Sequence, residues 1–139
     1  PEFSSRFTAR TTVLGDNYSI TPHAATYLTS PVVNLSSATG TVMLTFWRWL
    51  NCDYDPYVIE TIEAYNGTTW VTLWTSQPLG VTITDSAWVR QELDVTAHKS
   101  ATFQVRFSHF VGGAPPSDTA WVMSGWNIDD LSLSSAVCN

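Results

Sequence analysis

The chain has 139 residues and a formal net charge of −6, and charged residues make up only 13%, against roughly 25% in a typical soluble domain. Its six Lys and Arg residues are scattered singly, which excludes the basic surface that nucleic-acid binding requires, and no apolar run approaches the ~20 residues of a membrane span. The length fits one domain with a substantial core, and a chain rich in Ser, Thr and Trp is typical of secreted, extracellular all-β modules.

Short alternating segments separated by turn residues run along the chain, and helical periodicity is hard to find. Residues 1–12 are expected to be a tail or cloning remnant, residues 13–135 one domain, and residues 136–139 a second tail. Strands are expected over the ranges 25–30, 32–35, 41–51, 57–65, 70–75, 88–95, 101–110 and 121–132. This spacing predicts an all-β fold, a two-sheet antiparallel β-sandwich, with its clearest hairpin at Asn66-Gly67.

Alternation along residues 41–51 places Trp47 and Trp49 on the face of the strand opposite Phe46. Two such rings side by side on an outer face could stack on a sugar, with Tyr57 nearby as a polar neighbour. Trp121 follows a Pro-rich loop and could line a rim, where a ligand could bind instead. The alternative is that a loop or a neighbouring domain covers this face.

The same alternation turns Arg48 toward the core, together with Glu60 of the following strand. Because a buried charge is tolerated only when it is paired, these two residues are predicted to form an ion pair. The alternative is that each lies at the end of a sheet and reaches water.

The two cysteines, Cys52 and Cys138, could form a disulfide in an exported protein. Such a bridge would tie down the C-terminal tail and stabilise the fold by about 4–5 kcal/mol in the chain-entropy model. The alternative is a free thiol on a frayed end. Two cysteines alone supply too few ligands for a zinc site.

Several short motifs follow one another in an informative order: Leu28–Ser36, Leu44–Trp49, Asn66–Trp70, Leu93–Val95, Val105–Phe107 and Gly125–Leu131. This succession resembles the MAM-like jelly-roll modules appended to secreted bacterial metallopeptidases of the immune-inhibitor-A kind. It resembles jelly-roll carbohydrate-binding modules more distantly. The resemblance implies a jelly-roll sandwich and places Trp70, Trp88 and Trp126 in its core or at a corner.

The resemblance also implies a structural calcium ion held by an acid of the closing strand. By that analogy Asp129 or Asp130 would be a ligand, with Asp16 and Asp55 as further candidates, since Ca²⁺ takes six to eight oxygen ligands. The alternative is that Asp129 caps a bulge or pairs with Arg106. Neighbours on a regular strand point to opposite faces, so Asp129 and Asp130 are not expected to form a catalytic carboxylate pair.

The chain shows no Gly-x-Ser-x-Gly elbow and no zinc-like spacing of histidines, so enzyme activity is not expected. We expect a non-catalytic binding module of an exported multidomain protein, with a polysaccharide or glycan as its partner. The alternative is an accessory domain without a ligand of its own, packed against a neighbouring peptidase domain. The first would expose Trp residues around a groove, and the second would present a broad apolar patch.

Overall fold

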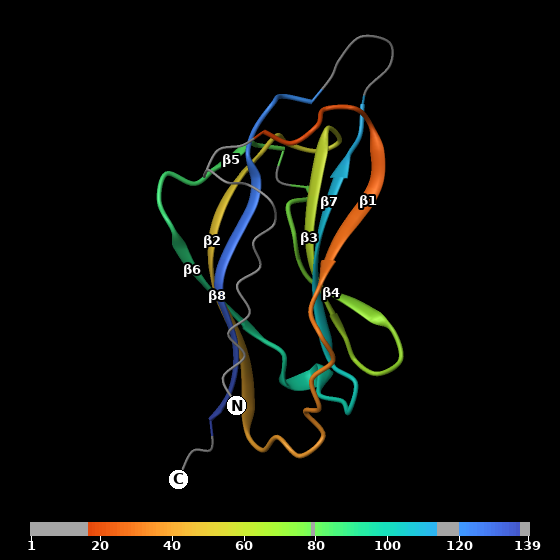
Figure 1. Cartoon of the computed structure of the whole chain (residues 1–139), viewed down its shortest axis with the longest axis vertical. Helices are drawn as coiled ribbons and strands as arrows, with labels where there is room; N and C mark the ends of the chain where they lie inside the picture. Colours follow the sequence, from red (N-terminus) through yellow and green to blue (C-terminus); the bar gives the residue numbers. More distant parts are fainter. Residues whose placement is uncertain (1–16, 79, 114–119, 137–139) are drawn as a thin grey trace.

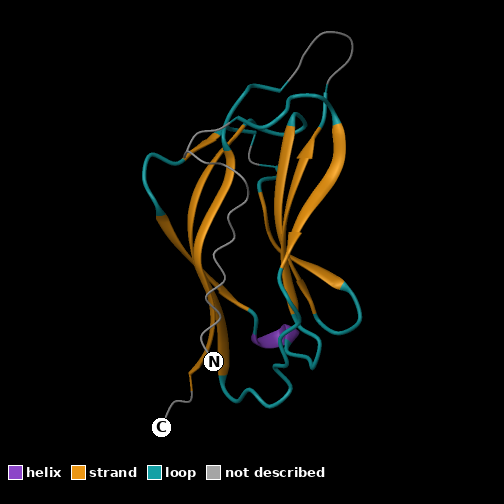
Figure 2. Ribbon diagram, viewed as in Figure 1, coloured by secondary structure: helices purple, strands orange, loops and turns teal. Residues whose placement is uncertain are grey.

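The computed structural model describes residues 17–78, 80–113 and 120–136. Two antiparallel sheets face each other, as Figures 1 and 2 show, which confirms the predicted β-sandwich. The first sheet has the strand order β1 (His23–Thr29), β7 (Gln104–Val111), β3 (Val58–Tyr65) and β4 (Trp70–Thr75).

The second sheet is built around the long central strand β2 (Thr41–Cys52). One side of β2 pairs with β8 (Gly125–Ala136), and the other side pairs with β5 (Ile83–Thr84) and β6 (Val89–Asp94). A short 3₁₀ turn, η1 (Thr96–His98), leads from β6 toward β7. In the described ranges, no helix has the length and apolar character needed to cross a membrane.

Most expected strands are present, with shifted ends. The Asn66-Gly67 hairpin joins β3 to β4, and Gly67 adopts a φ of 93°, a left-handed conformation that favours glycine. Strand β5 was not predicted, because two residues carry no alternation. Residues 32–35 contribute only an isolated bridge from Val33 to Phe103, and the closing strand begins later and runs further than expected.

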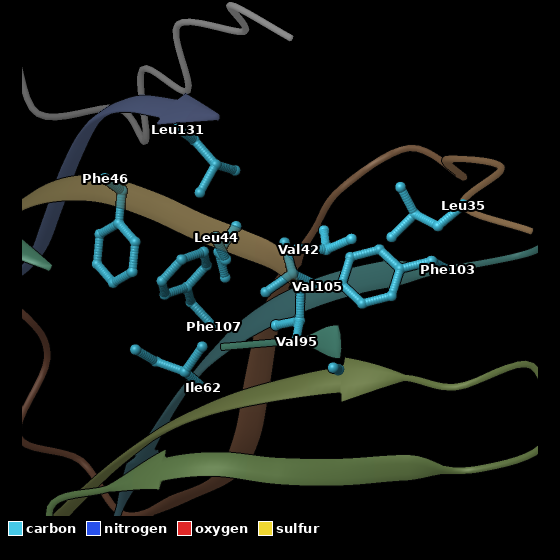
Figure 3. Close-up of a cluster of buried hydrophobic side chains, with 11 residues drawn as sticks. Leu35, Val42, Leu44, Phe46, Ile62, Val95, Phe103, Val105, Phe107 and Leu131 are labelled. Atoms are coloured by element: carbon cyan, nitrogen blue, oxygen red, sulfur yellow. The ribbon is translucent and has the colours of Figure 1, made fainter. Parts of the chain in front are cut away.

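The core lies between the inner faces of the two sheets, where alternate residues of each strand meet. Figure 3 shows Leu44 and Phe46 of β2 lying opposite Phe107 and Ile62 of the other sheet. The rings of Phe46 and Phe107 make an edge-to-face contact with centroids 5.2 Å apart. This packing fixes which residues of β2 face outward, and therefore sets the position of Trp47.

The predicted ion pair between Arg48 and Glu60 is wrong. Arg48 donates two hydrogen bonds to Asp85, at 2.9 and 3.0 Å, and Glu60 lies 2.7 Å from Nδ1 of His109. The reason is that β2 and β3 belong to different sheets, and each side chain finds its partner within its own sheet. Glu60 and His109 are opposite each other in the β3–β7 register.

Cys52 is a free, fully buried thiol within the described ranges, and Cys138, its predicted disulfide partner, lies outside them. Ala136 pairs with Thr41, at the opposite end of β2 from Cys52, a separation of roughly 36 Å at ~3.3 Å per residue. Burial raises the pKa of the Cys52 thiol to about 12.

Candidate functional site on the outer face of β8, β2 and β6

A β-bulge in β8 explains the paired aspartates of the closing strand. Thr45 pairs with Ser132 and Trp47 with Asp129, so two residues of β8 stand opposite the single residue Phe46. Asp130 has a φ of 50°, a left-handed conformation that Asp tolerates better than most residues. The bulge overturns the expectation that the two carboxylates point to opposite faces, because Asp129 and Asp130 are both exposed and line the same hollow.

This hollow, called here the Trp47 hollow, is formed by Trp47, Trp88, Asp129 and Asp130 and has a volume of about 290 Å³. Trp47 faces outward because the preceding residue, Phe46, is buried in the core and side chains alternate along a strand. The exposed fraction of Trp47 is 39%. The register places Trp47 between Asp129 of β8 and Arg90 of β6. Strands β2 and β8, together with the residue that precedes β6, therefore contribute to one site.

Trp88 lines the hollow, and the ring of Trp49 packs against it. Their rings meet edge to face, with centroids 6.0 Å apart and an interplanar angle of 90°. Asn127 of β8 donates a hydrogen bond to the backbone carbonyl of Trp49 at 3.1 Å. Trp88 was expected in the core or at a corner, but it lies immediately before β6 and lines the outer hollow.

The charged residues around the hollow leave the carboxylates of Asp129 and Asp130 available to a ligand. Arg90, the neighbour of Trp47 on β6, forms an exposed ion pair with Glu92. Asp129 accepts a hydrogen bond from the backbone N–H of Asp130 at 2.9 Å, and neither carboxylate has an ion pair among the described residues. The site therefore offers carboxylate oxygens beside an exposed indole ring.

Tyr57 and Trp121 lie in a different place, at the end of the sandwich where β2 ends. They belong to what we call the end patch, which consists of Tyr54, Tyr57, Trp121 and Val122. The buried carboxylate of Asp53 holds this patch together by accepting hydrogen bonds from the backbone N–H groups of Tyr54 and Trp121, at 2.9 and 2.8 Å. The structure thus divides the predicted ligand residues between two sites.

The expected calcium ligands are only partly brought together. Asp129 and Asp130 meet at the hollow, whereas Asp55 accepts a hydrogen bond from Gly80 in the loops beyond β2, and Asp16 lies outside the described residues. Within the described ranges no three His, Cys, Asp or Glu side chains gather in a way that could hold a metal ion. Two carboxylates fit only part of the six to eight oxygen ligands of Ca²⁺.

The outer face of the first sheet carries a second aromatic group, which the sequence did not reveal. Arg106 of β7 lies over the rings of Tyr27 and Trp70, with its guanidinium carbon 4.0 Å from each ring centroid. The same guanidinium donates a hydrogen bond of 2.6 Å to Glu63. Trp70 was expected in the core or at a corner, but it packs on this outer face against Arg106 and Tyr65.

A buried acid and histidine pair lies between the sheets. Glu60 is fully buried, and this burial raises the pKa of its carboxyl group. The contact with His109 lowers that pKa and offsets only part of the effect of burial. The ring of Tyr18 lies 4.8 Å from that of His109, and burial raises the pKa of Tyr18 to about 12. This cluster is part of the interior, next to the opening between β1 and β8.

Comparison with known proteins adds no assignment. No protein-family model matches the chain, and no curated protein matches it.

Proposed function

We propose that this domain is a non-catalytic carbohydrate-binding module of an exported protein, and that its ligand binds in the Trp47 hollow. The observation that carries the proposal is the meeting, on one sheet face, of an exposed Trp ring with two carboxylates that have no ion pair within the described part of the chain. A sugar presents an apolar face of C–H groups and an edge of hydroxyl groups. The indole ring suits the first, and carboxylate oxygens accept hydrogen bonds from the second.

The charge of the hollow narrows the class of ligand. Asp129 and Asp130 are adjacent, and Arg90, which stands opposite Trp47 on β6, is already paired with Glu92. An acidic polysaccharide would bring its own carboxylates or sulfates against these groups, which is unfavourable. The proposed ligand is therefore a neutral glycan with neighbouring hydroxyl groups.

The order of the strands supports the jelly-roll part of the proposal. Every connection except β3 to β4 and β5 to β6 carries the chain from one sheet to the other. Repeated crossing between two sheets is typical of jelly-roll and Greek-key sandwiches. The resemblance to secreted bacterial jelly-roll modules suggests the same fold and the same extracellular location.

Affinity electrophoresis of the domain tests this proposal. Gels containing neutral polysaccharides, such as xylan, β-glucan and mannan, are compared with gels containing alginate or polygalacturonate. We expect retardation on at least one neutral gel and none on the acidic gels. Running each gel with calcium and with chelator also tests the calcium expectation, since a structural ion would make both retardation and melting temperature sensitive to the chelator.

A second function is supported by the end patch. Trp121 is 68% exposed, Val122 52% and Tyr54 38%, and Asp53 holds the backbones of Tyr54 and Trp121 at the same end of the sandwich. Exposed apolar side chains gathered at one end suit a protein partner, as expected of an accessory domain beside a peptidase. Migration unchanged on every polysaccharide would favour this second function over the first.

A further inference from the structure

The short loop that joins β5 to β6 carries one of the rings of the Trp47 hollow (Figure 1). Trp88 lines the hollow and is the last residue of this loop. In the described register, the pairing of β6 with β2 begins one residue later, where Val89 stands opposite Arg48. The position of the Trp88 ring therefore depends on how the loop over residues 85–88 is held.

Asp85, the first residue of the loop, is fixed to β2 by its side chain and by its backbone. Its two carboxylate oxygens accept hydrogen bonds from Nε and Nη2 of Arg48, at 2.9 and 3.0 Å. The same carboxylate accepts from the backbone N–H of Leu50 at 2.9 Å, and the N–H of Asp85 donates to the carbonyl of Leu50 at 3.0 Å. Two parallel contacts from one guanidinium fix the orientation of a carboxylate, which a single contact does not.

The pair of Arg48 and Asp85 is largely buried between the sheets. The exposed fractions of the two side chains are 14% and 10%. The guanidinium carbon of Arg48 lies 5.8 Å from the ring centroid of Trp74, on β4 of the opposite sheet. Because the cost of removing two charges from water offsets much of their attraction, a buried pair adds little stability by itself. What this pair does is restrict Asp85 to one position on β2.

Three consecutive residues of β2 hold both ends of the loop. Arg48 and Leu50 bind Asp85 on the inner side of the sheet. Trp49, the residue between them, faces the other side, since side chains alternate along a strand. Its ring meets the ring of Trp88 edge to face, with centroids 6.0 Å apart. The inner contact at Asp85 and the outer contact at Trp88 therefore act together on one short segment.

We propose that Arg48 is a positioning residue of the binding site. Through Asp85 it fixes the loop between β5 and β6, and so keeps the ring of Trp88 at the Trp47 hollow. Arg48 is not among the residues that line the hollow, so it acts through Trp88 and not by touching the ligand. The inference rests on the proposed glycan site and extends the residues that set its affinity into the interior.

NMR relaxation of the free, ¹⁵N-labelled domain tests the position of Trp88 without a glycan. In the unmodified domain, the heteronuclear NOE at residues 86–88 should be as high as in the neighbouring strands, and NOE contacts should join the rings of Trp49 and Trp88. Arg48→Lys keeps the charge but replaces a planar fork by a single ammonium group. It should therefore lower the heteronuclear NOE at residues 86–88 and weaken the contacts between the two rings.

Glu63→Gln is the matched control, because it breaks the ion pair with Arg106, which has similar exposure on the first sheet. It should lower the melting temperature, as Arg48→Lys does, but leave residues 86–88 and the contacts of the Trp88 ring unchanged.

A double variant removes the pair without leaving a buried charge alone. Arg48→Met combined with Asp85→Asn has no unpaired charge at this position, and Asn can still accept from the N–H of Leu50. The fold should therefore be retained, and the loop and the Trp88 ring should loosen as they do in Arg48→Lys.

Isothermal titration with an oligosaccharide of the neutral polysaccharide that retards the domain links the loop to binding. Arg48→Lys and the double variant should weaken the affinity about threefold to tenfold, the size expected of a residue that acts on a ligand without touching it. Glu63→Gln should leave the affinity unchanged.

Two results would overturn the proposal while the glycan site stands. One is an unchanged heteronuclear NOE and unchanged ring contacts in Arg48→Lys and in the double variant. The other is an affinity that these variants leave unaltered, or lower no more than Glu63→Gln does, although Trp47→Ala abolishes binding. Failure of the unmodified domain to bind any glycan would overturn the proposed function instead. The relaxation measurement on the free domain would still decide whether Arg48 positions Trp88.

Discussion

On the outer face of the first sheet, the guanidinium of Arg106 lies between the rings of Tyr27 and Trp70 and is paired with Glu63. On the outer face of the second sheet, no cation lies over the ring of Trp47 among the described residues. The nearby aspartates are likewise unpaired there.

Both faces carry aromatic rings, carboxylates and an arginine. Among the described residues, only the outer face of the second sheet has a ring and carboxylates that are not engaged with one another or with an arginine. In the Arg106 group the ring faces and the carboxylate are already engaged with each other, so a ligand would have to displace them. Beside the Trp47 hollow, Arg90 is paired with Glu92, and the bulge at Asp130 places a second carboxylate in the hollow. Aromatic content alone therefore does not identify a binding face. What distinguishes the two faces is whether the groups around the rings are already paired with one another.

The largest difference between the two faces should appear on truncation of a tryptophan. Trp47→Ala should weaken binding of a retarding glycan by at least about thirtyfold, as expected for the loss of a central aromatic contact worth ~2 kcal/mol. Trp70→Ala, the matched change on the other face, should leave the affinity unchanged and lower stability instead. Isothermal titration and thermal unfolding of both variants measure these effects. Equal losses of affinity would contradict the distinction.

Arg106→Ala should destabilise the domain without affecting the ligand. It removes cation–π contacts with two rings, worth about 0.5–2 kcal/mol each, so the expected loss in free energy of unfolding is about 2 kcal/mol. Arg106→Lys keeps the charge but loses the planar stacking, and should recover only part of the loss. Urea unfolding gives both values. A destabilisation under ~0.5 kcal/mol would show that this group is not a fixed structural element.

Replacement of the bulge residue separates its conformation from its carboxylate. Asp130→Gly keeps access to the left-handed φ of 50°, so stability should change little. Affinity should fall by about tenfold, the cost of one hydrogen bond to a charged acceptor, and Asp129→Asn should act similarly. As the control, Glu63→Gln on the other face should change stability alone. Unaltered affinity in both aspartate variants would remove the carboxylates from the site.

The smallest expected effect concerns the interior between the two faces. Burial raises the pKa of Glu60 in the folded state above its usual value, so the folded protein holds this proton more tightly than the unfolded chain. The contribution of Glu60 is therefore fully present below about pH 4.3 and is lost as pH rises through the folded pKa. Glu60→Gln should flatten this decline, measured by urea unfolding across the pH range. An identical pH profile in both proteins would contradict the assignment.

Alternation was sufficient to predict the sandwich and the outward position of Trp47, and the Asn66-Gly67 turn was sufficient to predict the hairpin, because each depends on local residue order. The bulge at Asp130 was not predictable, since a single inserted residue leaves the alternation on either side intact. The partners of Arg48 and Glu60 depend on which strands share a sheet, and this is set by the whole topology. Trp70 was misplaced because its outward position depends on Arg106, far away in the sequence.

The most direct test of the account is an NMR titration of the ¹⁵N-labelled domain with a neutral oligosaccharide of the polysaccharide that retards it. We predict shifts of the indole N–H signals of Trp47 and Trp88 and of the backbone amides of Asp129 and Asp130, while the indole signals of Trp70 and Trp121 stay in place. Shifts centred on Trp121 or Trp70, or no shifts with any glycan of the panel, would contradict a binding site in the Trp47 hollow.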